Sequence, residues 1–191
     1  MAIDNSDFNL LHSACLSGVL AVAVYCDLKS RRIPNRLILA GLALALFCNG
    51  VVAPPSQGLD GPLGWGPCMA GAAVGLGTLL PLYGMGAMGA GDVKLMAVVG
   101  AFLGPSASLG AALATLVAGG FLAVAAALHW RVAPAMLRNV KTLLASGVAR
   151  LGVGDVPQFG EVRVSAGRLP YAVAIATGTA AYQAWTHSFL F

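Results

Sequence analysis

Residues 106–130 read SASLGAALATLVAGGFLAVAAALHW, and this segment decides the fold class because it contains no Asp, Glu, Lys or Arg. An apolar stretch of about 20 residues can cross the roughly 30 Å hydrocarbon core of a bilayer as an α-helix. The whole chain has the same character, since 58% of its 191 residues are hydrophobic and 9% are charged. A water-soluble domain carries about 25% charged residues, and a disordered chain needs low hydrophobicity. Both classes are excluded, and a helical membrane protein with several spans remains.

Polar breaks divide the chain into six apolar segments, which predict about six transmembrane helices in one membrane domain of residues 1–191. The predicted spans are 8–27, 35–53, 67–83, 92–103, 106–130 and 169–190. Between the last two spans, residues 134–151 place Leu and Val on one helical face and basic residues elsewhere. This pattern predicts an amphipathic helix on the cytoplasmic surface of an otherwise transmembrane all-α bundle.

The basic residues predict the orientation of this bundle. All 11 Lys and Arg residues fall on one side of the predicted spans, whereas the opposite loops carry Asp4, Asp7 and Asp60. Cytoplasmic loops of membrane proteins are enriched in Lys and Arg, so we expect the basic side to be cytoplasmic. Both termini are then expected to lie outside, in agreement with an even number of spans.

Glycine is frequent inside the predicted spans, and the chain has 25 glycines in all. In lipid, helices associate through small residues that let two backbones approach closely. The glycines in the third and fifth spans are therefore predicted to serve helix packing rather than catalysis. They are Gly71, Gly75 and Gly77, and Gly110, Gly119 and Gly120.

Two acidic residues, Asp27 and Asp92, lie at the predicted cytoplasmic ends of spans. Asp27 ends the first span, and Asp92 begins the fourth span directly after the glycine-rich stretch GMGAMGAG at 84–91. An ionisable residue at the edge of a span is costly and is therefore a candidate functional residue. Each also has a structural interpretation, because Asp92 can cap its helix and Asp27 can pair with Lys29 or Arg31.

Two carboxylates that share a site can hydrolyse a peptide bond without a metal or another cofactor. One keeps a proton, while the other accepts a proton from a water molecule that attacks the carbonyl carbon. The four cysteines form no C-x-x-C pair, so no zinc site is expected. From the positions of the two acids relative to the ends of their own helices, we expect Asp27 to hold the shared proton at rest and Asp92 to act as the base.

The sequence around both aspartates resembles that of type IV prepilin peptidases, which are intramembrane aspartyl proteases. The stretch GAGDVK at 89–94 is similar to the GxGD signature of these proteases. The stretch RIPN at 32–35, shortly after Asp27, is similar to their first-aspartate region. The stretch LPYAVAIA at 169–176 resembles their final helix. Together these motifs extend over most of the chain in the order typical of the family.

The resemblance implies an aspartic endopeptidase that removes the leader, or class III signal peptide, from prepilin-like precursors of type IV pilus or protein secretion systems. It implies the bacterial inner membrane as the location, a site that faces the cytoplasm, and a pilin-like precursor and the bilayer as partners, without nucleic acid. Asp27 and Asp92 are then the catalytic pair. The supporting residues that it implies are Arg32, Pro34, Asn35, Gly89, Gly91, Lys94 and Pro170.

The short connection between the first two spans indicates a branch of this family. About eight residues separate those spans, and they contain no cysteine pair. The chain is thus similar to the short Flp/Tad-type prepilin peptidases, or to archaeal preflagellin peptidases, which lack the insertion of the long methylating forms. Two alternatives stay open: a proton-coupled small transporter in which the two acids relay protons, and a non-catalytic secretion-machinery subunit in which both acids are caps.

Overall fold

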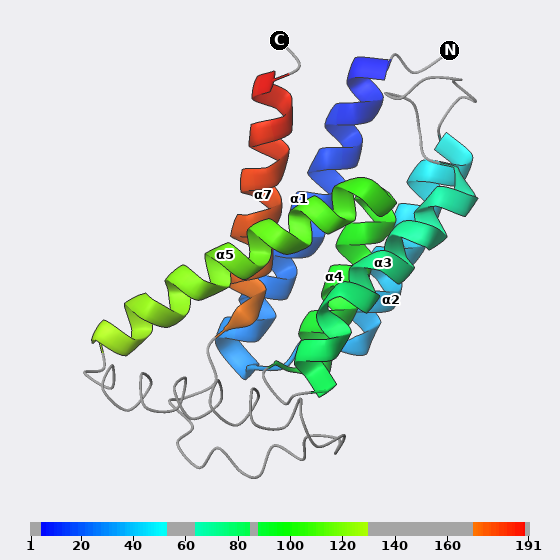
Figure 1. The fold of residues 1–191 in the computed structure, drawn as a ribbon. Coiled ribbons are helices and arrows are strands. Elements are labelled where there is room, and N and C mark those ends of the chain that lie inside the picture. Colours follow the sequence, from blue (N-terminus) through cyan, green and yellow to red (C-terminus); the bar gives the residue numbers. More distant parts are fainter. Residues whose placement is uncertain (1–4, 53–63, 85–87, 130–169, 190–191) are drawn as a thin grey trace, which may run out of the picture. The chain divides into compact units, whose positions relative to one another are not determined.

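The computed structural model describes residues 5–52, 64–84, 88–129 and 170–189 (Figure 1). Within these ranges all regular structure is helical, which confirms the predicted all-α class. The helices are α1 (Asn5–Ser30), α2 (Asn35–Phe47), the π-helix η1 (Cys48–Val52), α3 (Trp65–Gly84), α4 (Ala90–Leu103), α5 (Pro105–His129) and α7 (Tyr171–Phe189).

Three of these helices are long and apolar enough to cross a membrane. They contain the segments Asp7–Ser30, Trp65–Gly84 and Pro105–Ala126, and Asn35–Gly50 forms a shorter apolar helix. The chain is therefore a membrane protein, whereas the number of about six crossings stays a prediction. The amphipathic helix expected at 134–151 lies outside the described residues.

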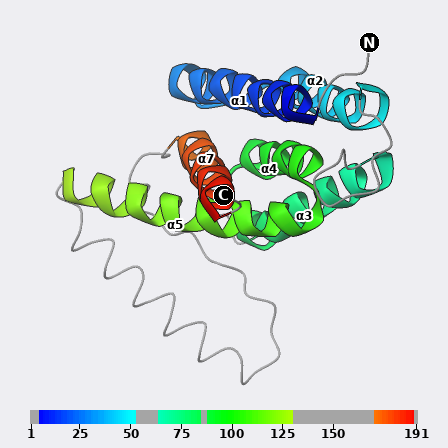
Figure 2. The same ribbon diagram turned by 90° about the horizontal axis from the view of Figure 1, so that it is seen from above.

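Helix α4 lies at the centre of the helices that contact it. It packs against α1, α2, α3 and α7, and Figure 2 shows it between the α1–α2 pair and α3. Val93 and the run from Leu95 to Phe102 are buried. A helix that is apolar on all sides is stable when protein surrounds it. This surrounding explains how a 14-residue helix, about 21 Å long, can lie inside a membrane protein although it is shorter than the bilayer core.

Glycine residues allow α3 to approach α4 closely. A Cβ atom added at Gly71 would collide with the backbone carbonyl of Gly100, and one at Gly75 would collide with the carbonyl of Met96. The packing prediction is confirmed for these two residues, and also for Gly110 and Gly119 of α5, which face tyrosine rings of α7. It is wrong for Gly77 and Gly120, because an added Cβ there would meet no atom of the described residues within 4 Å.

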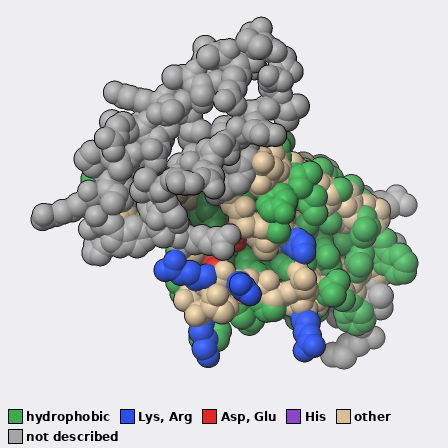
Figure 3. Space-filling model, turned by 90° about the horizontal axis from the view of Figure 1, so that it is seen from below, with side chains coloured by type: hydrophobic (Ala, Val, Ile, Leu, Met, Phe, Trp, Pro, Cys, Tyr) green, Lys and Arg blue, Asp and Glu red, His purple; other side chains and the backbone are tan. Residues whose placement is uncertain are grey.

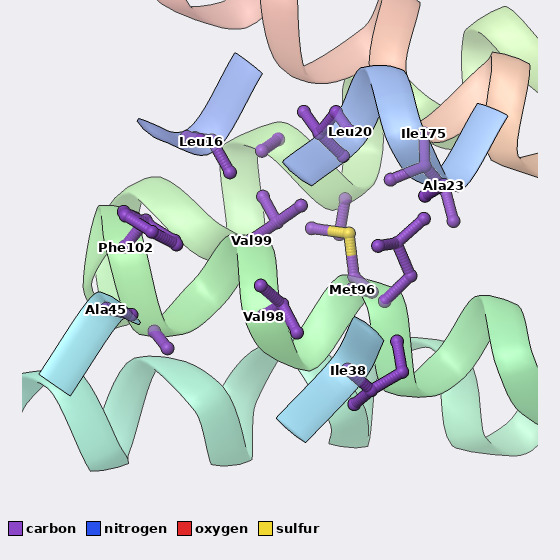
Figure 4. Close-up of a cluster of buried hydrophobic side chains, with 14 of the residues drawn as sticks. Leu16, Leu20, Ala23, Ile38, Ala45, Met96, Val98, Val99, Phe102 and Ile175 are labelled. Atoms are coloured by element: carbon purple, nitrogen blue, oxygen red, sulfur yellow. The ribbon is translucent and has the colours of Figure 1, made fainter. Parts of the chain in front are cut away.

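A buried hydrophobic cluster joins α1, α4 and α7 (Figure 4). Leu20 and Ala23 of α1 lie against Met96 of α4 and Ile175 of α7 in this cluster. Ala23 is one helical turn before Asp27, and Ile175 lies in the second turn of α7. Apolar packing therefore holds the end of α1 beside the beginning of α7.

The chain divides into two compact units, residues 1–119 with 170–191, and residues 120–169. The first unit contains both aspartates and the residues described below as their neighbours. Of the second unit, the structure describes only residues 120–129, the last part of α5. The expectation of a single domain therefore stays a prediction.

Candidate active site

Asp27 lies in the last turn of α1, with only 7% of its surface exposed. A buried carboxylate needs hydrogen bonds to offset the loss of water. Its Oδ2 atom accepts one from the backbone N–H of Ala172, the second residue of α7, at 3.1 Å. Asp27 therefore connects two helices that are far apart in the sequence.

The chain leaves α1 at Arg31, one turn after Asp27. Arg31 adopts a positive φ of 52°, and its N–H donates to the carbonyl of Asp27 over 2.8 Å. The Ser30 hydroxyl donates to the carbonyl of Cys26 over 2.8 Å. The last four carbonyls of a helix have no partner within it, so the Arg31 N–H satisfies the carbonyl of Asp27. The left-handed residue ends the helix and directs residues 32–34 towards α4.

Asp92 is the third residue of α4 and is half-buried. Its Oδ2 atom accepts a hydrogen bond from the N–H of Gly89 at 3.2 Å, and its own N–H donates to the Gly89 carbonyl at 3.1 Å. The carboxylate thus caps its own helix, as one interpretation of the sequence predicted. Its negative charge also acts on the phenol of Tyr171 in α7.

The stretch RIPN packs directly on the glycine-rich entry to α4. A Cβ added at Gly91 would lie 3.3 Å from the Cβ of Ile33, so Ile33 covers this glycine. The Lys94 ammonium donates to the Asn35 side-chain oxygen over 3.0 Å. Two motifs that are more than 50 residues apart are therefore in contact.

The remaining supporting residues shape the ends of helices. Pro34 precedes α2 with extended backbone, and its carbonyl accepts the N–H of Leu37 over 3.0 Å. Pro170 precedes α7, and its carbonyl accepts the N–H of Val173 over 3.2 Å. Arg32 is exposed, and its carbonyl accepts from the Ser30 hydroxyl. Pro34 and Pro170 therefore fix backbone direction near the two acids, and their role in the reaction stays a prediction.

The first turn of α7 interacts with both aspartates, since Ala172 contacts Asp27 and Tyr171 interacts with Asp92. Tyr171 and Ala172 belong to the stretch LPYAVAIA, of which the family resemblance implies only Pro170, directly before α7, as a site residue. The structure also changes the electrostatic comparison of the two acids. Asp27 is near the negative end of α1, but it faces the positive N-terminal end of α7. Helix ends alone thus no longer distinguish which acid holds the proton.

Basic side chains surround this end of the molecule. Figure 3 shows acidic side chains visible between Lys and Arg side chains on one face. The Lys and Arg residues of the described ranges are all exposed, and they are Lys29, Arg31, Arg32, Arg36 and Lys94. Lys29 lies over the Tyr25 ring, 5.6 Å from its centroid. Among the described residues, no group of three or more His, Cys, Asp or Glu side chains is arranged to hold a metal ion.

Comparison with known proteins assigns the family. Residues 14–124 match the model of the type IV leader peptidase family. This range includes Asp27, RIPN and GAGDVK, while α7 lies beyond it. No curated protein and no solved structure is significantly similar to the chain. The match covers more than half of the sequence, and the chain therefore belongs to the type IV leader peptidase family.

Proposed function

We propose that this protein is a membrane aspartic endopeptidase that removes the leader peptide of prepilin-like precursors at the cytoplasmic membrane face. Membership of the family supports a protease. The observation that carries the proposal is that contacts join the surroundings of the two acids: α7 donates a backbone N–H to Asp27, and Ile33, shortly after Asp27, covers Gly91 directly before Asp92. Acids that only capped separate helices would not need these contacts.

In the proposed reaction the two carboxyl groups share one proton. The ionised group accepts a proton from a water molecule as the water oxygen attacks the carbonyl carbon of the scissile peptide bond. The protonated group donates a hydrogen bond to the carbonyl oxygen, on which negative charge develops. When the tetrahedral intermediate collapses, the leaving amine takes up a proton from the pair. Because the groups titrate together, the active form is a property of the pair.

Backbone contacts orient both carboxylates for this reaction. In each residue the Oδ2 atom accepts a hydrogen bond from a backbone N–H, at 3.1 Å in Asp27 and 3.2 Å in Asp92. A side chain held by the backbone loses little conformational freedom when the reacting groups come together. An asparagine can still accept this hydrogen bond through its single carbonyl oxygen, but it cannot take part in proton transfer.

The decisive experiment uses the full-length protein in lipid vesicles with a prepilin-like precursor whose basic leader ends at glycine. Cleavage is followed by the change in gel mobility and by mass spectrometry of the new N-terminus. Asp27→Asn and Asp92→Asn are each expected to lower the cleavage rate at least 1000-fold, because either change removes one member of the pair. Asp7→Asn is the matched control, since Asp7 is an exposed acid in the first turn of α1.

The alternatives give different results. The hydrogen bond between Gly89 and Asp92 is the one observation that favours a non-catalytic subunit with interfacial caps. That function predicts no cleavage by the wild type and a loss of stability in Asp92→Ala, which removes the capping oxygen. A transporter predicts proton flux into the vesicles without cleavage. Cleavage that survives either aspartate substitution would reject the two-aspartate mechanism.

A further inference from the structure

Ile33 lies against the glycine that directly precedes Asp92. A Cβ atom added at Gly91 would be 3.3 Å from the Cβ of Ile33, 3.6 Å from its Cγ1 and 3.7 Å from its Cδ1. The isoleucine side chain therefore contacts this glycine along its length, from the branch point to the terminal methyl group. Ile33 is half-buried and also packs against the buried hydrophobic cluster of α1, α4 and α7. Through it, the segment after α1 rests on the beginning of α4.

The backbone around Ile33 is restrained on both sides. Arg31, two residues earlier, is held by the hydrogen bond from its N–H to the Asp27 carbonyl, at 2.8 Å. Two residues later, the side chain of Asn35 accepts the hydrogen bond from Lys94, at 3.0 Å. These two bonds attach the segment that carries Ile33 to α1 at one end and to α4 at the other.

An isoleucine that precedes a proline is also stiff in itself. Pro34 follows Ile33, and a residue before proline favours extended backbone because the proline ring clashes with it in the helical region. The branched Cβ of isoleucine limits rotation about χ1. Ile33 is thus a spacer of nearly fixed length between the end of α1 and the entry to α4.

We propose that Ile33 is a positioning residue that sets the distance between the Asp27 and Asp92 carboxylates. This inference rests on the proposed function. Ile33 rests on the turn at residues 89–91, in which the Gly89 N–H holds the Asp92 carboxylate at 3.2 Å. A shift of this turn would move the carboxylate, and a misplacement of about 1 Å can lower a rate about 100-fold. The side chain acts through the backbone next to Asp92, without contact with the reacting peptide.

Shortening Ile33 tests whether its length matters. Ile33→Ala removes the Cγ1 and Cδ1 atoms that lie along Gly91, so the turn before Asp92 loses its support. In the vesicle assay with the prepilin-like precursor, we expect kcat per folded protein to fall about tenfold while KM changes less than twofold, because a displaced carboxylate slows the reaction without weakening substrate binding. Ile33→Val keeps the branched Cβ and should retain at least half of the wild-type kcat. Leu39→Ala, which shortens an exposed side chain of α2, is the matched control.

A disulfide can replace this packing contact by a covalent one. Two Cβ atoms joined through a disulfide lie about 3.5–4.5 Å apart, and the Cβ of Ile33 is 3.3 Å from the position of a Cβ at residue 91. The double variant Ile33→Cys with Gly91→Cys should therefore form a disulfide after mild oxidation, which mass spectrometry of the linked peptides detects. We expect the oxidised double variant to cleave at least fivefold faster than the same protein after reduction, because the bond restores a fixed distance. The two single variants and the wild type, which contains four native cysteines, should not respond to reduction.

The outcomes separate this inference from the proposed function. A full kcat in Ile33→Ala, or a disulfide-linked double variant that is no faster than its reduced form, would overturn the role of Ile33. Failure of the disulfide to form would contradict the contact itself. If the double variant does not insert into the membrane, Ile33→Ala and Ile33→Val decide alone. A wild type that cleaves nothing removes the proposed function and this inference with it, whereas wild-type cleavage with an unchanged Ile33→Ala removes this inference only.

Discussion

The side chains of Lys94 and Asn35 are joined by a hydrogen bond of 3.0 Å between Nζ and Oδ1. Asn35 is the first residue of α2, directly after the turn that follows Asp27, and Lys94 lies two residues after Asp92. The bond therefore connects the segments that carry the two acids. It lies at the exposed end of the helices, where an ammonium group keeps its contact with water.

This bond should matter for activity more than for folding. Asn35→Ala and Lys94→Met are each expected to lower the cleavage rate three- to tenfold, because the RIPN segment loses its polar contact with α4. The cleavage rate of the double variant should be no lower than that of the less active single variant, because both substitutions remove the same interaction. Arg36→Gln is the control, as it removes a neighbouring exposed charge. Multiplicative losses in the double variant would show that the two side chains act separately.

The size of residue 91 should control how closely RIPN packs on α4. A methyl group at Gly91 would lie 3.3 Å from the Cβ of Ile33, which is tight but can be relieved by a small shift. We expect Gly91→Ala to keep about a third of the wild-type cleavage rate and Gly91→Val to keep less than a hundredth, because overpacking displaces the backbone next to Asp92. Gly77→Ala in α3 meets no atom within 4 Å in the part of the chain that the structure describes, and it serves as the control. Equal rates for Gly91→Ala and Gly91→Val would contradict this packing.

The α3–α4 contact should depend on glycine in a position-specific way. Gly71→Ala drives a methyl group against the carbonyl of Gly100, and we expect it to lower the free energy of unfolding by about 1–3 kcal/mol. Gly77→Ala should raise the free energy of unfolding by up to about 1 kcal/mol, because alanine is the better helix former. Unfolding in mixed micelles of increasing SDS content, followed by circular dichroism, measures both. Similar values for the two variants would show that the close approach of α3 and α4 is not required.

Asn49 should stabilise the protein without affecting cleavage. Its buried side-chain amide donates to the carbonyl of Ala101 over 3.2 Å. Ala101 is in the last turn of α4, where carbonyls have no partner within the helix. Asn49→Ala is expected to cost about 1–3 kcal/mol of unfolding free energy, because it leaves a buried carbonyl without a donor. The same SDS titration measures this loss. The cleavage rate of the folded variant should stay within twofold of wild type, since Asn49 contacts the end of α4 opposite to Asp92. A large fall in kcat with unchanged stability would contradict this separation.

The fold class and most helix positions could be predicted from the sequence because they depend on local properties. A segment such as 106–130 must be helical in a membrane, where each backbone N–H needs a partner within its own segment. The structure places the corresponding helix α5 at Pro105–His129. Helix α1 extends three residues beyond the predicted span, because the left-handed Arg31 and not Asp27 ends it. The two aspartates were identified by a similarly local argument, since charge is rare at the edge of a span.

What the sequence alone determined was therefore the membrane class, the helices and the two candidate acids at the edges of spans. Only the tertiary structure decided what those acids meet. The packing of α1, α4 and α7 brings the first turn of α7 to Asp27, and the missing side chain at Gly91 lets Ile33 rest on the backbone directly before Asp92. Contacts of this kind join residues far apart in the chain, and they depend on how side chains of different helices fit together. No local pattern of hydrophobicity or charge encodes that fit, so it became visible only when the helices were assembled.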